Sequence, residues 1–254
     1  MQVQRQIITP RGLKIVEGAA KPFEALNVAR NLLRTAPSAS LATLDPSGYP
    51  YGTMTNIAVE PSGTPYFFTA NLALHARNIA ADNRVSLVLF PPGKPDVLTQ
   101  PRLTLVGRAR RLAADEIDRA KARYAARFPK AKLYLSLPDA MLYRLLIEDL
   151  RFNGGPARNA VTDVTPEMLR TDLSGAEALL DAEDALVDRL NATAGLPKRL
   201  ADRAGAKAGN WAVCGIDPDG IDLTCAHAHA RLWFAVRVTA PQELWDVVRT
   251  GAPV

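Results

Sequence analysis

The chain has 254 residues, of which 48% are hydrophobic, 22% charged and 6% aromatic. This length supports a conventional buried core in one large or two modest domains, and the composition excludes a mainly disordered chain. No apolar run approaches the ~20 residues needed to cross a bilayer, and the opening MQVQRQIITPRG lacks the apolar stretch of a secretory signal. We therefore expect a globular, cytoplasmic protein with no membrane partner.

Basic residues outnumber acidic ones by 31 to 26, which gives a formal net charge of +5. Much of the excess lies in residues 102–132, where a basic amphipathic helix is predicted with Ile117, Ala120, Tyr124 and Phe128 on one face. Its arginines could neutralise nucleic-acid phosphates, but a solvated polar face is the commoner role, and no nucleic-acid motif accompanies them. A nucleic-acid partner is therefore not expected.

The chain has only two cysteines, Cys214 and Cys225. Two cysteines are too few for a disulfide framework, and no paired Cys/His spacing indicates a zinc site. We expect both to be buried thiols and assign no metal centre.

The first part of the chain predicts a helix followed by antiparallel strands. Apolar residues recur at helical spacing in 22–36, and β-rich runs follow at 38–45, 49–60 and 64–70, separated by the turns DPSG and EPSG. The pattern at 141–152 fits helix or strand, and strand is favoured because aromatic residues bracket it and GGP ends it. The remaining predicted elements are a short helix at 71–83, a buried strand at 84–90, a loop at 91–101 and a strand at 102–112.

A change of composition near residue 160 indicates a second unit, so we assign 1–160 and 161–254 to separate domains. The second unit is predicted to contain a helix over 179–191 and three strand-like runs within 210–238, the first two joined by a DPDG turn. A last helix is predicted to end at Gly251.

Two predicted helix starts in the second unit carry the spacing of a capping box, in which a Ser or Thr is followed three residues later by Glu or Gln. These pairs are Ser174 with Glu177 and Thr239 with Gln242. We expect each pair to satisfy backbone N–H groups at its helix start.

Several strings over residues 23–112 resemble the FMN-binding split β-barrel of the pyridoxamine-phosphate oxidase superfamily. They are SLATLDPSGYPYGTMTNIAVEPSGTPYFFT, LALHARNIAADNRVSLVL and RLTLVGRARRL. The resemblance continues through KARYAARFPKAKLYLSLPDAMLYRL and RFNGGPAR to the branch of haem-utilisation proteins, and GIDPDGIDL resembles their small C-terminal domain. It implies an α+β protein, in which a split β-barrel of antiparallel strands with flanking helices precedes a small α+β domain. It also implies a homodimer with the flavin held between two barrels.

The end of the predicted strand at 64–70 suits the phosphate of FMN. A phosphate monoester needs cations or the free N–H groups of a helix start. Thr69, His75, Arg77 and Asn78 lie where this strand runs into a helix, so that Thr69 and the first helical amides would hold the phosphate, Arg77 would pair with it and Asn78 would support the turn. The alternative is a short surface helix whose polar side chains are only solvated.

The preceding hairpin strand suits the flavin ring. Thr53, Met54, Thr55 and Asn56 offer alternating side chains and backbone edges, as a ring with donors and acceptors along one rim requires. Arg158, in GGPAR, would meet an anionic group from a loop at the edge of the cofactor. For Thr53–Asn56 the alternative is an ordinary half-exposed strand. For the GGPAR segment it is a simple turn after a strand.

The sequence departs from the oxidase pattern at the phosphate site. Where the oxidases carry a Ser-Arg-Lys run that contacts phosphate, this chain has Ala73, Leu74 and His75. This departure argues against oxidation of pyridoxamine phosphate itself.

Haem binding is the second interpretation that the resemblance implies. Haem iron takes a His, Cys, Met or Tyr ligand, and the chain has three histidines, His75, His227 and His229. The last two are spaced i, i+2 on a predicted strand, so both face one side and could meet a haem or a metal ion. An exposed strand end is the alternative.

Three functions are therefore open. The first is an FMN-dependent oxidoreductase acting on an unidentified small molecule, in which the flavin carries the chemistry and no side chain is assigned a catalytic role. The second is a haem-binding or haem-degrading utilisation protein. The third is a cofactor-free binding module on the same fold.

Overall fold

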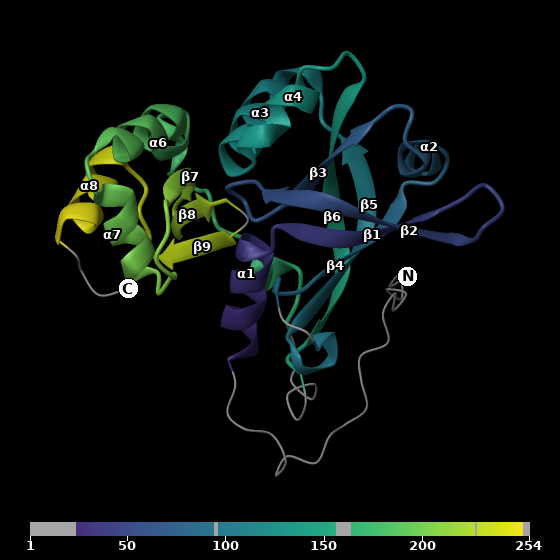
Figure 1. Ribbon diagram of the computed structural model, residues 1–254, viewed down its shortest axis with the longest axis horizontal. Coiled ribbons are helices and arrows are strands. Elements are labelled where there is room, and N and C mark those ends of the chain that lie inside the picture. The colour runs from purple at the N-terminus through teal and green to yellow at the C-terminus, as the bar shows by residue number, and fades with distance from the viewer. Residues whose placement is uncertain (1–23, 94–95, 156–163, 227, 251–254) are drawn as a thin grey trace, which may run out of the picture.

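A computed structural model describes residues 24–93, 96–155, 164–226 and 228–250 of the protein (Figure 1). The strands of its larger sheet are β1 (Ser38–Leu44), β2 (Pro50–Val59), β3 (Pro65–Ala70), β4 (Arg84–Leu89), β5 (Arg102–Arg111) and β6 (Ala140–Asn153). They form a closed antiparallel barrel in the order β1-β2-β3-β6-β5-β4. The strands predicted in this part of the chain are confirmed, including the choice of strand over helix for β6.

The barrel interior is built from strand residues that alternate between core and surface. In β1 every second residue is buried, and the neighbouring strands supply large apolar side chains to the same core. Leu41, Phe67, Leu87 and Leu105 are among those with no exposed surface. The period of two in the sequence is thus the direct cause of the barrel core.

The helices are α1 (Ala25–Thr35), α2 (Leu74–Ala81), α3 (Ala114–Arg127), α4 (Lys132–Leu135), α5 (Glu177–Asp181), α6 (Glu183–Ala192), α7 (Leu196–Arg203) and α8 (Pro241–Thr250). Short 3₁₀ turns lie at Val97–Thr99, Pro129–Ala131 and Glu167–Leu169. Among the described residues, no helix has the length and apolar character needed to cross a bilayer.

A smaller antiparallel sheet, β7-β8-β9, lies beside the barrel (Figure 1). Its strands are β7 (Ala212–Asp217), β8 (Gly220–Cys225) and β9 (Ala228–Trp233). α6 and α7 contact β7. From the barrel part of the chain, α3 contacts β7 and α1 contacts β9. The small C-terminal α+β unit is therefore confirmed, whereas the predicted boundary at residue 160 falls outside the described residues.

Both predicted capping boxes are wrong. Before α5, the hydroxyl of Ser174 donates to a carboxylate oxygen of Asp172 at 2.8 Å and does not cap the helix. At α8, the side chain of Glu243, and not that of Gln242, accepts the N–H of Thr239 at 2.7 Å. The helix begins one residue later than the pattern predicts. The side chain that caps it is therefore also one position later, Glu243 in place of Gln242.

The basic helix α3 packs two of its arginines inside the protein, which corrects the expectation of a solvated basic face. Arg123 is 8% exposed and Arg127 is 4% exposed. Nε of Arg123 donates to the carbonyl of Val59 at 2.8 Å, and Nε of Arg127 donates to the carbonyl of Ile57 at 3.1 Å. Both arginines thus fasten α3 to the end of β2.

The two cysteines differ in their surroundings. Cys214 is buried and Cys225 is half-buried, so the prediction of a buried thiol is confirmed for the first alone. Burial raises the pKa of Cys214 to about 12, so its thiol is protonated at neutral pH.

Candidate functional site

The barrel opens between β2 and β3. β2 pairs with β1 along residues 50–56, but it pairs with β3 only along residues 57–59. A continued β2–β3 register would place Thr55 opposite Thr69. Both strands are fully described here, and their backbone pairing ends at Ile57. The strands therefore separate there and leave backbone N–H and C=O groups along one edge of β2.

The residues predicted to meet a flavin ring lie along this open edge. Met54 and Asn56 are exposed, with 58% of Met54 accessible, while Thr53 and Thr55 point to the other face and are half-buried. The structure thus brings Thr53–Asn56 and the end of β3 to the two sides of one opening. The β1–β2 hairpin and α2 border it in Figure 1.

At the end of β3, Thr69 is tied to the following helix. Its side chain is buried, and its hydroxyl oxygen lies 2.7 Å from Nε2 of His75, within hydrogen-bond distance. Burial lowers the pKa of His75, so the ring is neutral at pH 7. His75 therefore positions the start of α2 but does not supply a positive charge for a phosphate.

Arg77 and Asn78 take opposite positions on α2. Asn78 is fully buried, and its Nδ2 donates to the hydroxyl of Thr43 at 3.0 Å, which holds α2 against β1. Arg77 is exposed. The helix begins after Ala73, which provides no side-chain cap, so N–H groups of its first turn remain open to an anion.

Large exposed apolar side chains lie on the segments that border the opening. Leu72 is 77% exposed and Leu74 is 48% exposed, and both lie in the turn and first residue that lead into α2. Together with Met54 they form what we call the apolar rim. The sequence did not single out Leu72 and Leu74 as functional candidates. Two leucines close together in a turn could have been noticed, because exposed apolar patches mark surfaces that contact another molecule.

Of the remaining predicted site residues, His229 lies away from this opening. Arg158 and His227 lie outside the described residues. His229 lies on β9 of the smaller sheet, and its Nδ1 is buried without a hydrogen-bond partner among the described residues. His229 as a whole is half-buried.

The surroundings of His229 keep its ring neutral. Burial lowers its pKa to about 3, with a further contribution from Arg127. The edge of the ring meets Phe128, with ring centres 5.4 Å apart. His229 lines two adjoining hollows of about 310 and 200 Å³, which also share Asn31 and Thr35 of α1.

The six antiparallel strands follow one another around a barrel, but β2 and β3 pair over only part of their length, and a short helix lies at the opening between them. This arrangement defines a split-barrel protein. The family model described as pyridoxamine 5'-phosphate oxidase matches residues 27–154, and the chain belongs to this family. No protein of curated function matches the chain.

Two solved structures are similar over nearly the whole chain. The protein Atu2129 of Agrobacterium tumefaciens, of unknown function, is 55% identical over 96% of this chain and 98% of its own, with a TM-score of 0.85. A haem-binding protein from Mycobacterium smegmatis is 25% identical over 90% of this chain and 96% of its own, with a TM-score of 0.54. The expected likeness to the haem-utilisation branch is thereby confirmed.

Proposed function

We propose that the protein is an FMN-binding split-barrel oxidoreductase that acts on a small molecule. The observation that carries this proposal is the open backbone edge of β2 beside the uncapped start of α2. An edge of hydrogen-bonding groups suits a flavin ring, and an uncapped helix start next to a cation suits a phosphate. The two features lie together, as one FMN molecule requires.

The donor set at the opening fits FMN. The first N–H groups of α2 and the guanidinium of Arg77 would hold the phosphate, and the β2 edge from Thr53 to Asn56 would meet the ring. Thr69 and His75 would fix the start of α2 through their contact. FMN, when bound, supplies hydride or electron transfer, and the protein supplies position and electrostatics.

A homodimer with the flavin between two barrels is part of the proposal. The apolar rim is exposed in a single chain, and exposed apolar patches of this kind mark surfaces that another molecule covers. A second copy seated on the rim would remove Met54, Leu72 and Leu74 from water and close the opening around the ring.

The cofactor content of the purified protein tests this function. We expect flavin absorption bands, or uptake of added FMN, and loss of FMN from the Arg77→Ala variant. Arg84→Ala is the matched control, because Arg84 is exposed just beyond α2 and pairs only with Asp82 among the described residues. Unchanged FMN binding in Arg77→Ala would refute the phosphate assignment.

Haem is a second candidate ligand, and His229 is the observation that favours it. A neutral imidazole is the form that binds haem iron, and this ring lines two hollows beside the small sheet. The similar Mycobacterium smegmatis protein is a haem-binding protein. We propose that the hollows beside His229 would receive the haem.

Titration with haemin tests this second candidate. A Soret band that His229→Ala abolishes and His75→Ala retains would support it, because His75 lies at the barrel opening. Identical spectra in both variants would exclude His229 as the ligand. A protein that takes up neither flavin nor haem would be a cofactor-free binding module.

A further inference from the structure

In Figure 1, α7 and α8 lie on the side of the C-terminal unit that is away from the barrel. Together with α6 they line a cleft of about 490 Å³. We call it the three-arginine cleft. Its lining includes Arg189 of α6, Arg199 of α7, and Gln242, Trp245 and Arg249 of α8. Its size is that of a site for a small organic ligand. Three guanidinium groups from three helices therefore share one hollow.

Two of these arginines have no acidic partner. Within the described residues, neither Arg189 nor Arg199 forms an ion pair with a carboxylate, and Arg249 alone does so, at 2.8 Å from Asp246. Like charges that share a cleft raise the local positive potential, and a negatively charged ligand would relieve it. The cleft is thus electrostatically prepared for an anion.

The start of α7 adds to the same potential. A helix N-terminus carries a partial positive charge and usually has acidic residues in its first turn. The first turn of α7 contains no acid, and Arg199 extends from it into the cleft lining. Gly195 precedes this turn with φ of 68°, and a Cβ at this position would lie 3.4 Å from Nη1 of Arg199. The guanidinium therefore folds back over the helix start.

Neighbouring groups hold the other two arginines in place. The guanidinium of Arg189 lies 4.5 Å from the ring centre of Trp245, which is a cation–π contact. Asp246 accepts from both Arg249 and Gln242. Less side-chain freedom is lost when a ligand binds cations that are already positioned.

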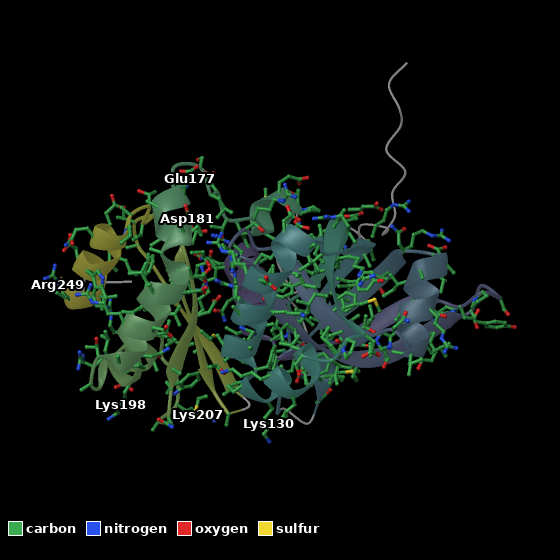
Figure 2. All side chains as sticks on the ribbon, turned by 90° about the horizontal axis from the view of Figure 1, so that it is seen from above. Lys130, Glu177, Asp181, Lys198, Lys207 and Arg249 are labelled. Carbon is green, nitrogen blue, oxygen red and sulfur yellow. The ribbon has the colours of Figure 1, made fainter. Side chains whose placement is uncertain are left out.

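We propose that the three-arginine cleft binds a small phosphorylated anion. Arginine recognises phosphate oxygens through paired N–H groups, and the partial positive charge at the start of α7 strengthens the attraction. Figure 2 shows Arg249 and Lys198 projecting at this end of the molecule, well away from the barrel. The site is independent of the proposed flavin and haem positions.

Calorimetric titration with pyrophosphate and with adenosine monophosphate tests the proposal. We expect saturable one-to-one binding of at least one probe, weakened about tenfold or more in Arg189→Gln and in Arg199→Gln. Lys198→Gln is the matched control, because it removes an equal charge from the same helix turn without lining the cleft. Tighter binding of adenosine monophosphate would indicate that its base contacts Trp245.

Two results would overturn the proposal. One is the lack of saturable binding of either probe at low ionic strength. The other is an equal loss of affinity in Lys198→Gln and Arg199→Gln, which would show a general charge effect. Arg189 and Arg199 are exposed, so unchanged circular dichroism of the variants is expected and will verify folding.

Discussion

Arg231 of β9 and Asp217 of β7 form an ion pair of 2.7 Å in which both side chains are fully excluded from solvent. Asp222 of β8 accepts from the same guanidinium at 2.7 Å and from Arg123 of α3 at 2.9 Å. Arg34 of α1 lies 3.1 Å from the second oxygen of Asp217. The small sheet is therefore joined to the barrel helices through a buried ionic cluster.

Asp222 is the carboxylate on which this cluster depends. Burial alone would raise its pKa, but Arg231, Arg34 and Arg123 together hold the pKa below its ordinary value. We expect Asp222→Ala to lower the free energy of unfolding by about 3–5 kcal/mol, because it leaves buried arginines without their partner. Urea unfolding measures this change. Asp82→Ala, which removes a surface ion pair, should leave the midpoint close to that of the wild type.

Gly215 of β7 is required by the packing of Arg123. A Cβ at this position would lie 2.6 Å from Cζ of the buried guanidinium, which Val59, Glu183 and Asp222 hold in place. We expect Gly215→Ala to destabilise the protein by about 1–3 kcal/mol. Gly52→Ala is the control, since a Cβ there meets nothing within 4 Å. Similar thermal midpoints for both variants would contradict this packing.

The neutral ring of His229 predicts a pH dependence of stability. Its pKa is about 3 in the folded protein against an ordinary value of 6.5, so the unfolded chain binds the proton more readily. Stability should be highest above pH 6.5 and should fall as the pH drops towards 3. Chemical unfolding of wild type and His229→Gln at several pH values checks this, and an identical pH dependence of both would contradict it.

The apolar rim predicts the effect of a charge at the proposed dimer contact. We expect Leu72→Arg to shift the protein to the monomer, because a guanidinium at the centre of an apolar contact loses its hydration. Sedimentation velocity reports the oligomeric state. Leu133→Arg is the control, as Leu133 is 80% exposed on α4, away from the rim. A dimer that persists in Leu72→Arg would exclude this face as the contact.

Local patterns predicted the barrel strands because burial alternates along them. The period of two in β1 and the turns on either side of β2 are sequence features, and they set the strands directly. The cluster around Asp222 was not predictable in this way. Arg123 is 99 residues from Asp222 in the chain, and an arginine on an amphipathic helix reads as solvated until its partner is known.

The candidate site was predictable only in part, because the sequence shows residue types but not which of them meet in the fold. Thr53–Asn56 and Thr69 were singled out by residue type, but their meeting at one opening depends on where the β2–β3 ladder stops. The contact of Thr69 with His75 and the burial of His229 depend on tertiary packing. No local period in the sequence encodes these features.

Comparison of FMN with riboflavin tests the central claim most directly, because riboflavin has the same ring but lacks the phosphate. We expect fluorescence titration to show FMN binding about 100-fold more tightly than riboflavin, as two charge-assisted contacts would give. Arg77→Ala should reduce this preference at least about tenfold and leave riboflavin affinity unchanged. Equal affinity of the wild type for both flavins, or an unaltered preference in Arg77→Ala, would contradict a phosphate site at the start of α2.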